Sequence, residues 1–172
     1  MSTTSEPALT GGCQCGAVTY ESTALPDELT NCHCFTCRKI SGGAYLTFAR
    51  FPSASLTWKS KSNALKTTQY SDMAMRWHCA DCGSPISMMY KFQREKISLT
   101  AGSIDEKSVK GVLVKPVEHI FLAEKAPWFI VPDDGLNRFE TFPDMEGFVK
   151  KMEEWKKGSK TGGAGGGREF GC

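Results

Sequence analysis

Three cysteines, Cys32, Cys34 and Cys37, lie within six residues of one another and offer the most distinctive chemistry in this sequence. Three thiols this close cannot all pair with one another as disulfides, because disulfide bonds need an even count and separated Cα atoms. A soft divalent metal accepts several thiolates at once, and zinc does so without redox chemistry. We therefore predict that these residues, called the cysteine triplet below, hold a zinc ion and leave one coordination position free for a ligand.

Two further cysteine pairs flank short loops. Cys13 and Cys15 are separated by one residue, and the segment Cys79–Cys82 has the Cys-x-x-Cys spacing and is followed by Gly83. A Cys-x-x-Cys-Gly sequence is typical of a zinc knuckle, whereas Cys-x-Cys is a weaker signal on its own. When Cys172 in the glycine-rich tail is set aside, seven cysteines remain. They divide naturally into four ligands for a closed structural zinc and three for an open one, although spacing alone does not prove this partition.

Histidines offer an alternative partition, in which an eighth ligand closes both sites. His33 lies between two candidate ligands, so we expect its side chain to point away from them. His78 precedes Cys79 in an expected strand and should face the opposite side. We therefore expect neither histidine to be a ligand. His119 could act as a proton shuttle, but the interpretation as a hydrogen-bonded core histidine is favoured.

The composition indicates a single globular domain. The chain has 172 residues, of which 40% are hydrophobic and 23% charged, and its formal net charge is only +2. Such a weak basic balance disfavours nucleic-acid binding. No apolar run is long enough to cross a membrane, and the first residues do not resemble a secretory signal. We expect a cytoplasmic protein, in which clustered cysteines bind metal more often than they form disulfides.

Short segments rich in β-branched and aromatic residues recur along most of the chain and predict an all-β fold. The expected strands are 17–22, 44–48, 56–59, 65–70, 86–90, 96–100 and 112–114. Up to about residue 131 no segment has helical periodicity. We expect residues 1–10 to be a flexible N-terminus and residues 11–131 to form the zinc domain.

The C-terminal part has a different pattern. Between residues 144 and 157, Met145, Phe148, Met152 and Trp155 recur at three- and four-residue steps. This spacing predicts an amphipathic helix that lies on the sheet and ends at Gly158. We expect residues 132–157 to be an extension that carries this helix, and residues 158–172 to be a disordered glycine-rich tail.

The motifs together resemble a known family. Residues 12–20, 32–38, 76–83 and 116–121 are similar to the corresponding segments of the glutathione-dependent formaldehyde-activating enzymes, and the likeness spans about residues 11–131. The same domain occurs in centromere protein V. One departure is His78, where such proteins often have phenylalanine.

The resemblance implies an Mss4-like fold of antiparallel sheets clipped by two zinc ions per chain. It implies that Cys13, Cys15, Cys79 and Cys82 hold a structural zinc and that the cysteine triplet holds the catalytic one. The implied activity is that of a carbon–sulfur lyase that joins a thiol such as glutathione to formaldehyde or another small carbonyl compound. Arg38 is our candidate for a contact with a substrate carboxylate. The alternative is a zinc-stabilised binding or chaperone-like module without catalysis.

Overall fold

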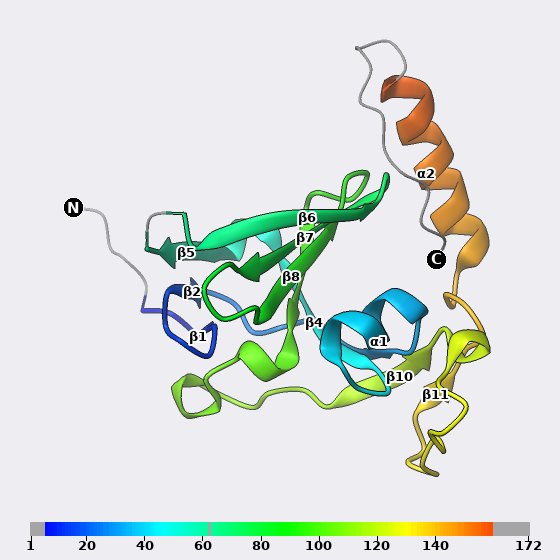
Figure 1. Cartoon of the computed structure of the whole chain (residues 1–172), viewed down its shortest axis with the longest axis horizontal. Coiled ribbons are helices and arrows are strands. Elements are labelled where there is room, and N and C mark those ends of the chain that lie inside the picture. The colour runs from blue at the N-terminus through cyan, green and yellow to red at the C-terminus, as the bar shows by residue number, and fades with distance from the viewer. Residues whose placement is uncertain (1–5, 62, 160–172) are drawn as a thin grey trace.

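The computed structural model describes residues 6–61 and 63–159, and the strands within these residues form two sheets (Figure 1). The smaller sheet has three strands in the order β1 (Leu9–Gly12), β2 (Val18–Ser22) and β5 (Leu56–Ser60). The larger sheet has eight strands in the order β11 (Asn137–Arg138), β10 (Pro116–Ile120), β3 (Glu28–Cys32), β4 (Leu46–Pro52), β9 (Lys96–Thr100), β8 (Pro85–Tyr90), β7 (Ala74–Cys79) and β6 (Leu65–Ser71). These strands confirm the predicted all-β fold.

Pairing is antiparallel throughout both sheets except at β10, which runs parallel to β3 on one side and to β11 on the other. A parallel neighbour needs a long connection, and here the chain passes through most of the large sheet between β3 and β10. The segment 112–114, which we predicted to be a strand, has no strand partner, so that prediction was wrong. It lies in the connection that leads into β10, where Val112 and Val114 are exposed and Leu113 packs against the main core.

The main core lies between the two sheets. Because side chains alternate along a strand, Leu29 of β3, Phe51 of β4 and Leu99 of β9 face the small sheet. They pack there with Leu9 and Tyr20 in one buried cluster. Hydrophobic burial on this face of the large sheet therefore joins the two sheets.

The opposite face of the large sheet carries the cysteine triplet. Cys32 ends β3 and belongs, with Cys34 and Cys37, to a second buried cluster that includes Phe48 and Ile120. The main core and the triplet thus occupy opposite faces of one sheet. Changes at the triplet are consequently separated from the main hydrophobic core.

A short helix that the sequence analysis did not predict follows β3. Helix α1 (Phe35–Ser41) has Cys34 as its N-cap residue and ends at Gly42, which has a φ of 69°. A left-handed φ is strained for most residues, so glycine suits this position. With seven residues, the helix is too short to show a hydrophobic period in the sequence.

Helix α2 (Met145–Ser159) confirms the predicted amphipathic helix, although it continues through Gly158 and ends one residue later. None of its described residues is buried, and Figure 1 shows it at the edge of the molecule, far from β1 and β2. No described helix is long and apolar enough to cross a membrane.

The two ends of the chain differ in part from our expectation. Leu9 and Thr10 were expected in a flexible segment but lie in β1, where Leu9 is completely buried and Thr10 pairs with Glu21. Burial of the Leu9 side chain in the main core explains why the folded domain includes residues before 11. Residues 1–5 and 160–172, which include most of the predicted glycine-rich tail, lie outside the described residues.

Candidate metal centres

The four-cysteine cluster consists of Cys13, Cys15, Cys79 and Cys82, whose sulfur atoms all lie within 4.8 Å of one another. The sulfurs of Cys13 and Cys15 are 3.5 Å apart, and those of Cys15 and Cys79 are 3.7 Å apart. Four sulfurs at the usual distance around a tetrahedral zinc ion would be about 3.8 Å from one another. All four are free cysteines. The cluster therefore fits a closed zinc site with four thiolate ligands.

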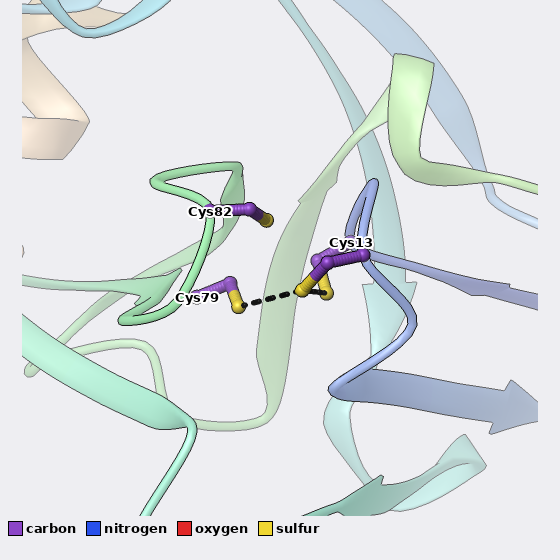
Figure 2. A group of neighbouring side chains, drawn as sticks. Cys13, Cys79 and Cys82 are labelled. Atoms are coloured by element: carbon purple, nitrogen blue, oxygen red, sulfur yellow. Dashed lines mark hydrogen bonds between the residues drawn. The ribbon is translucent and has the colours of Figure 1, made fainter.

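Two loops from distant parts of the chain build this cluster. Figure 2 shows Cys79, at the end of β7, and Cys82, on the loop that follows, facing Cys13 on the loop between β1 and β2. Gly16 and Gly83 follow the two pairs with φ values of 73° and 74°, which allow each loop to turn tightly around its sulfurs. The amide of Gln14 donates to the hydroxyl of Ser84 at 3.2 Å and links the two loops directly, and a shared zinc ion would clip them further.

Two of the four sulfurs, those of Cys13 and Cys82, have hydrogen bonds that favour the thiolate form, whereas the pKa values of Cys15 and Cys79 are raised. The amide of Val18 donates to the sulfur of Cys13 at 3.2 Å, and the hydroxyl of Ser84 lies 3.2 Å from the sulfur of Cys82. Hydrogen bonds from Ser84 lower the pKa of Cys82 to about 6. An amide or hydroxyl that donates to sulfur stabilises its charged form, which is the form that binds zinc.

The cysteine triplet also gathers its three sulfur atoms within 4.8 Å of one another, and all three side chains are buried. Cys32 comes from the end of β3, Cys34 caps α1, and Cys37 lies in the first turn of that helix. The amide of Cys37 donates to the sulfur of Cys34 at 3.4 Å. The start of the helix therefore brings two of the sulfurs together. Within the described residues, no fourth Cys, His, Asp or Glu joins this group.

A cation faces the triplet from β7. The guanidinium of Arg76 lies 3.7 Å from the sulfur of Cys37. Hydrogen bonds from the thiols of Cys32 and Cys34, aided by the charge of Arg76, lower the pKa of Cys37 to about 4. Burial alone would lower the pKa of Arg76, but the negative charge of Cys37, together with those of Tyr90 and Cys34, outweighs burial and raises that pKa. The sulfur of Cys37 is thus negative at neutral pH, whereas hydrogen bonds with Cys34 and Cys37 raise the pKa of Cys32. A bound metal ion would favour the deprotonated form of all three.

The three histidines lie outside both clusters. His33 Nε2 is 2.8 Å from His119 Nδ1, and His119 Nε2 is 3.0 Å from a carboxylate oxygen of Asp134. Both rings are buried, and His119 is flanked along β10 by residues that face the triplet, so its own side chain points to the other face. Burial and the charge of His119 lower the pKa of His33 to about 4, which keeps it neutral at pH 7. His119 is therefore a hydrogen-bonded core histidine.

His78 is likewise separate from the four-cysteine cluster. Its Nδ1 atom lies 3.3 Å from the hydroxyl oxygen of Thr68 on the neighbouring strand β6. Among the described residues, the cluster contains only its four cysteines. The expectation that neither His33 nor His78 joins a cluster agrees with this geometry.

The buried histidine pair leads to a prediction for Asp134. The hydrogen bond from His119 lowers the pKa of this carboxyl group. A carboxyl group whose pKa is lowered by folding stabilises the protein above its unfolded pKa of about 3.9 and loses this effect as the pH falls through its folded value. We expect Asp134→Ala to lower the melting temperature by about 2–4 °C at pH 7.

Thermal melts at pH 7 and at successively lower pH values test this prediction. The difference between wild type and Asp134→Ala should shrink as the pH falls below about 4. Asp133→Ala is the matched control, because Asp133 is an exposed neighbour. A difference that stays constant across this pH range would contradict the role of the ionised carboxylate.

A cavity of about 600 Å³ adjoins the cysteine triplet. Its lining includes all three cysteines, Arg76 and Tyr90, and is otherwise mainly apolar and aromatic. This volume is within the range of small-molecule binding sites. Arg38, our candidate for substrate contact, is not among the lining residues, and its guanidinium lies 5.5 Å from the centre of the Phe35 ring. Arg76 and Tyr90 were missed because only the folded sheet brings β7 and β8 next to the triplet.

Comparison with known families shows to which family the chain belongs. The family model described as "Glutathione-dependent formaldehyde-activating enzyme" matches residues 8–124, which is more than half of the chain. The chain belongs to this family. Membership in the glutathione-dependent formaldehyde-activating enzyme family agrees with the resemblance in the cysteine motifs, all of which lie inside the matched residues.

One solved structure resembles the chain at low sequence identity. A crystal structure of a Rhodobacter sphaeroides protein has 20% sequence identity and a TM-score of 0.49, and the match covers 76% of this chain and 99% of that chain. No curated protein matches the chain.

The family match ends before the C-terminal extension. Residues 8–124 contain both cysteine clusters, Arg76 and Tyr90. Phe142 and Phe148 lie beyond the match and also line the cavity next to the triplet. Part of the cavity wall is therefore supplied by a segment that the model of the glutathione-dependent formaldehyde-activating enzyme family does not cover.

Proposed function

We propose that this protein catalyses the addition of a thiol to a small carbonyl compound, with glutathione and formaldehyde as the first pair to test. The observation that carries this proposal is the buried cysteine triplet, which has three sulfur ligands and opens into a cavity of about 600 Å³. A closed site with four protein ligands is typical of structural zinc, whereas three ligands and an open position are typical of catalytic zinc. This feature favours an enzyme over the alternative of a zinc-stabilised binding module.

Two zinc ions per chain fit the two clusters. The four-cysteine cluster would hold the structural ion, and the cysteine triplet would hold the other. A zinc ion at the triplet would accept a substrate sulfur as its fourth ligand and lower the pKa of that thiol. Seven reduced cysteines that serve as ligands also suit a reducing compartment, so we propose a cytoplasmic location.

Arg76 compensates the charge of this site. Three thiolates and one divalent ion carry a net charge of −1, and a substrate thiolate adds another negative charge. The guanidinium of Arg76 lies 3.7 Å from the sulfur of Cys37 and lines the cavity. It therefore stabilises negative charge where the substrate sulfur would lie. We therefore propose that Arg76, and not Arg38, is the cation that stabilises negative charge at this site.

Tyr90 is our candidate proton donor. When the substrate sulfur attacks the carbonyl carbon, a carbon–sulfur bond forms, the C=O π electrons move to oxygen, and that oxygen needs a proton. Burial raises the pKa of Tyr90, and the negative charge of Cys32 raises it further. Tyr90 lines the same cavity and stays protonated at neutral pH. Its hydroxyl can therefore donate to the carbonyl oxygen, and a proton from solvent then restores the phenol.

Substitution of Tyr90 with phenylalanine tests this assignment. The change removes only the hydroxyl, so we expect kcat to fall by about 100-fold while thiol binding stays within about 2-fold. The rate can be measured by exchange NMR with ¹³C-labelled formaldehyde and glutathione, after subtraction of the uncatalysed rate. Tyr70→Phe is the matched control, because Tyr70 is exposed and does not line this cavity.

Two outcomes of the same experiment would contradict the proposal. If the zinc-loaded wild-type protein does not accelerate exchange with any small carbonyl compound, the proposed reaction is wrong. If wild type is active and Tyr90→Phe retains full activity, Tyr90 is not the proton donor.

A further inference from the structure

The C-terminal extension closes one side of the cavity beside the cysteine triplet. Phe142 and Phe148 stack with their ring centres 4.4 Å apart. Phe148 also contacts the rings of Tyr90 and Phe92, each with ring centres 5.1 Å apart, and these two residues lie at the end of β8 and in the turn that follows it. Aromatic contacts at these distances are favourable. The extension is thus anchored to the large sheet by its rings.

One face of α2 also contributes to this wall. Met145, Phe148, Val149 and Met152 line the cavity, and they lie on one side of the helix at three- and four-residue steps. None of the described residues of α2 is buried. The apolar face of the helix is therefore directed at the cavity but is only partly covered by the protein itself.

The surroundings of the triplet are apolar as well. Phe48, Met88 and Ile120 are buried in the same cluster as the three cysteines, and Tyr90 and Phe142 pack against this cluster. A ligand whose sulfur lies beside the three cysteine sulfurs would place its next atoms among these side chains. Such a wall favours carbon-rich groups, since burial of apolar surface is favourable and unpaired polar groups are disfavoured.

The cations of the cavity are mostly engaged by other groups. Arg50 forms an ion pair with Glu28 at 2.7 Å, and Lys96 pairs with Asp27. Arg76 contacts the sulfur of Cys37. Among the described lining residues, this leaves Lys151 at the exposed surface of α2. The lining therefore offers little to the two carboxylates of glutathione.

From these observations we infer that the preferred thiol of this protein carries an uncharged apolar group about the size of an aromatic ring, and that the C-terminal segment Phe142–Met152 selects it. This inference rests on the proposed function, because it requires the substrate sulfur to lie beside the cysteine triplet. The reaction forms and breaks the same bonds as in the proposed function, and only the group attached to the thiol differs.

Binding of three thiol probes to the zinc-loaded full-length protein tests the inference. The probes are benzyl mercaptan, which is apolar, 2-mercaptoethanol, which is small and polar, and glutathione. We expect benzyl mercaptan to bind at least about 10-fold more tightly than each of the other two, because its ring is buried against the apolar wall. Calorimetry gives the three dissociation constants without any need for turnover.

Variants in the wall separate selection from general binding. Phe148→Ala should reduce the preference for benzyl mercaptan over 2-mercaptoethanol by about 5-fold or more, and Met152→Ala should change it in the same direction by a smaller factor. Lys150→Ala is the matched control, because Lys150 is on the same helix, is exposed and does not line the cavity. Zinc content and melting temperature show whether each variant remains folded.

The outcomes distinguish this inference from the proposed function. Thiols that bind with equal affinity, or glutathione that binds most tightly, would overturn the inference and leave the proposed function intact. A preference that stays the same in both Phe148→Ala and Met152→Ala would overturn the role of the C-terminal segment. Absence of binding by all three thiols would overturn both the inference and the proposed function.

Discussion

Replacement of Cys79 with serine should unfold the protein at room temperature or bring it close to unfolding. Cys79 is completely buried and belongs to both the four-cysteine cluster and the main core. A serine hydroxyl is a poor zinc ligand, and a structural zinc site contributes on the order of 10 kcal/mol to folding. A domain of this size has a net stability of about 5–15 kcal/mol. The loss of one ligand is therefore comparable with the whole net stability.

Metal analysis and circular dichroism measure this effect. We expect Cys79→Ser to lose the zinc of the four-cysteine cluster together with its cooperative thermal transition. Ala80→Ser is the matched control, because it introduces a hydroxyl into the same exposed loop without removing a ligand. A Cys79→Ser protein that keeps two zinc ions and melts within a few degrees of wild type would show that Cys79 is not a structural ligand.

Chelation provides an independent test of the same site. Removal of both ions from the wild-type protein should produce the same unfolding as Cys79→Ser, since both treatments leave the four-residue cluster without its ion. Added zinc should restore the fold of wild type and fail to restore that of the variant. Because chelation leaves the Cys79 side chain in place, unfolding of the wild type by chelation would show that metal loss, and not a packing defect at Cys79, is the cause.

The sequence was most informative about residues whose chemistry is visible locally. The spacing of the cysteines pointed to the two clusters that the structure brings together, because a knuckle places its ligands within a few residues. The content of β-branched and aromatic residues located β2, β4, β5, β6, β8 and β9, and most of these strands have one face on a buried cluster. The periodic residues of α2 likewise marked a helix with one apolar face.

Features that depend on distant pairing were not predictable from the sequence. The parallel position of β10 beside β3, and the approach of Arg76 to Cys37 from a strand 39 residues away, arise only when the large sheet forms. Helix α1 was missed for a different reason, because its two turns are too short to show a period. The role of the C-terminal extension as a cavity wall also depends on ring contacts with Tyr90 and Phe92.

The second large effect is expected from Cys34→Ser, which should abolish activity and leave the fold in place. Cys34 is the N-cap of α1, where its sulfur accepts a hydrogen bond from the amide of Cys37. Serine is a favourable N-cap residue, so the hydroxyl can replace this hydrogen bond while it removes a metal ligand. The triplet also lies on the opposite face of the sheet from the main core. We therefore expect the melting temperature to fall by only a few degrees.

Zinc content, melting and thiol binding should respond differently in this variant. We expect zinc to fall from two ions per chain to one, kcat/KM to fall by about 1,000-fold, and thiol binding to be lost. Thr36→Ser is the matched control, because it is a conservative change between the two cysteines that begin α1. Loss of both ions with global unfolding would make the triplet a structural site, and unchanged thiol binding would remove it from substrate recognition. Because the cap is retained, a selective loss of one ion and of thiol binding would assign the open site to these three sulfurs.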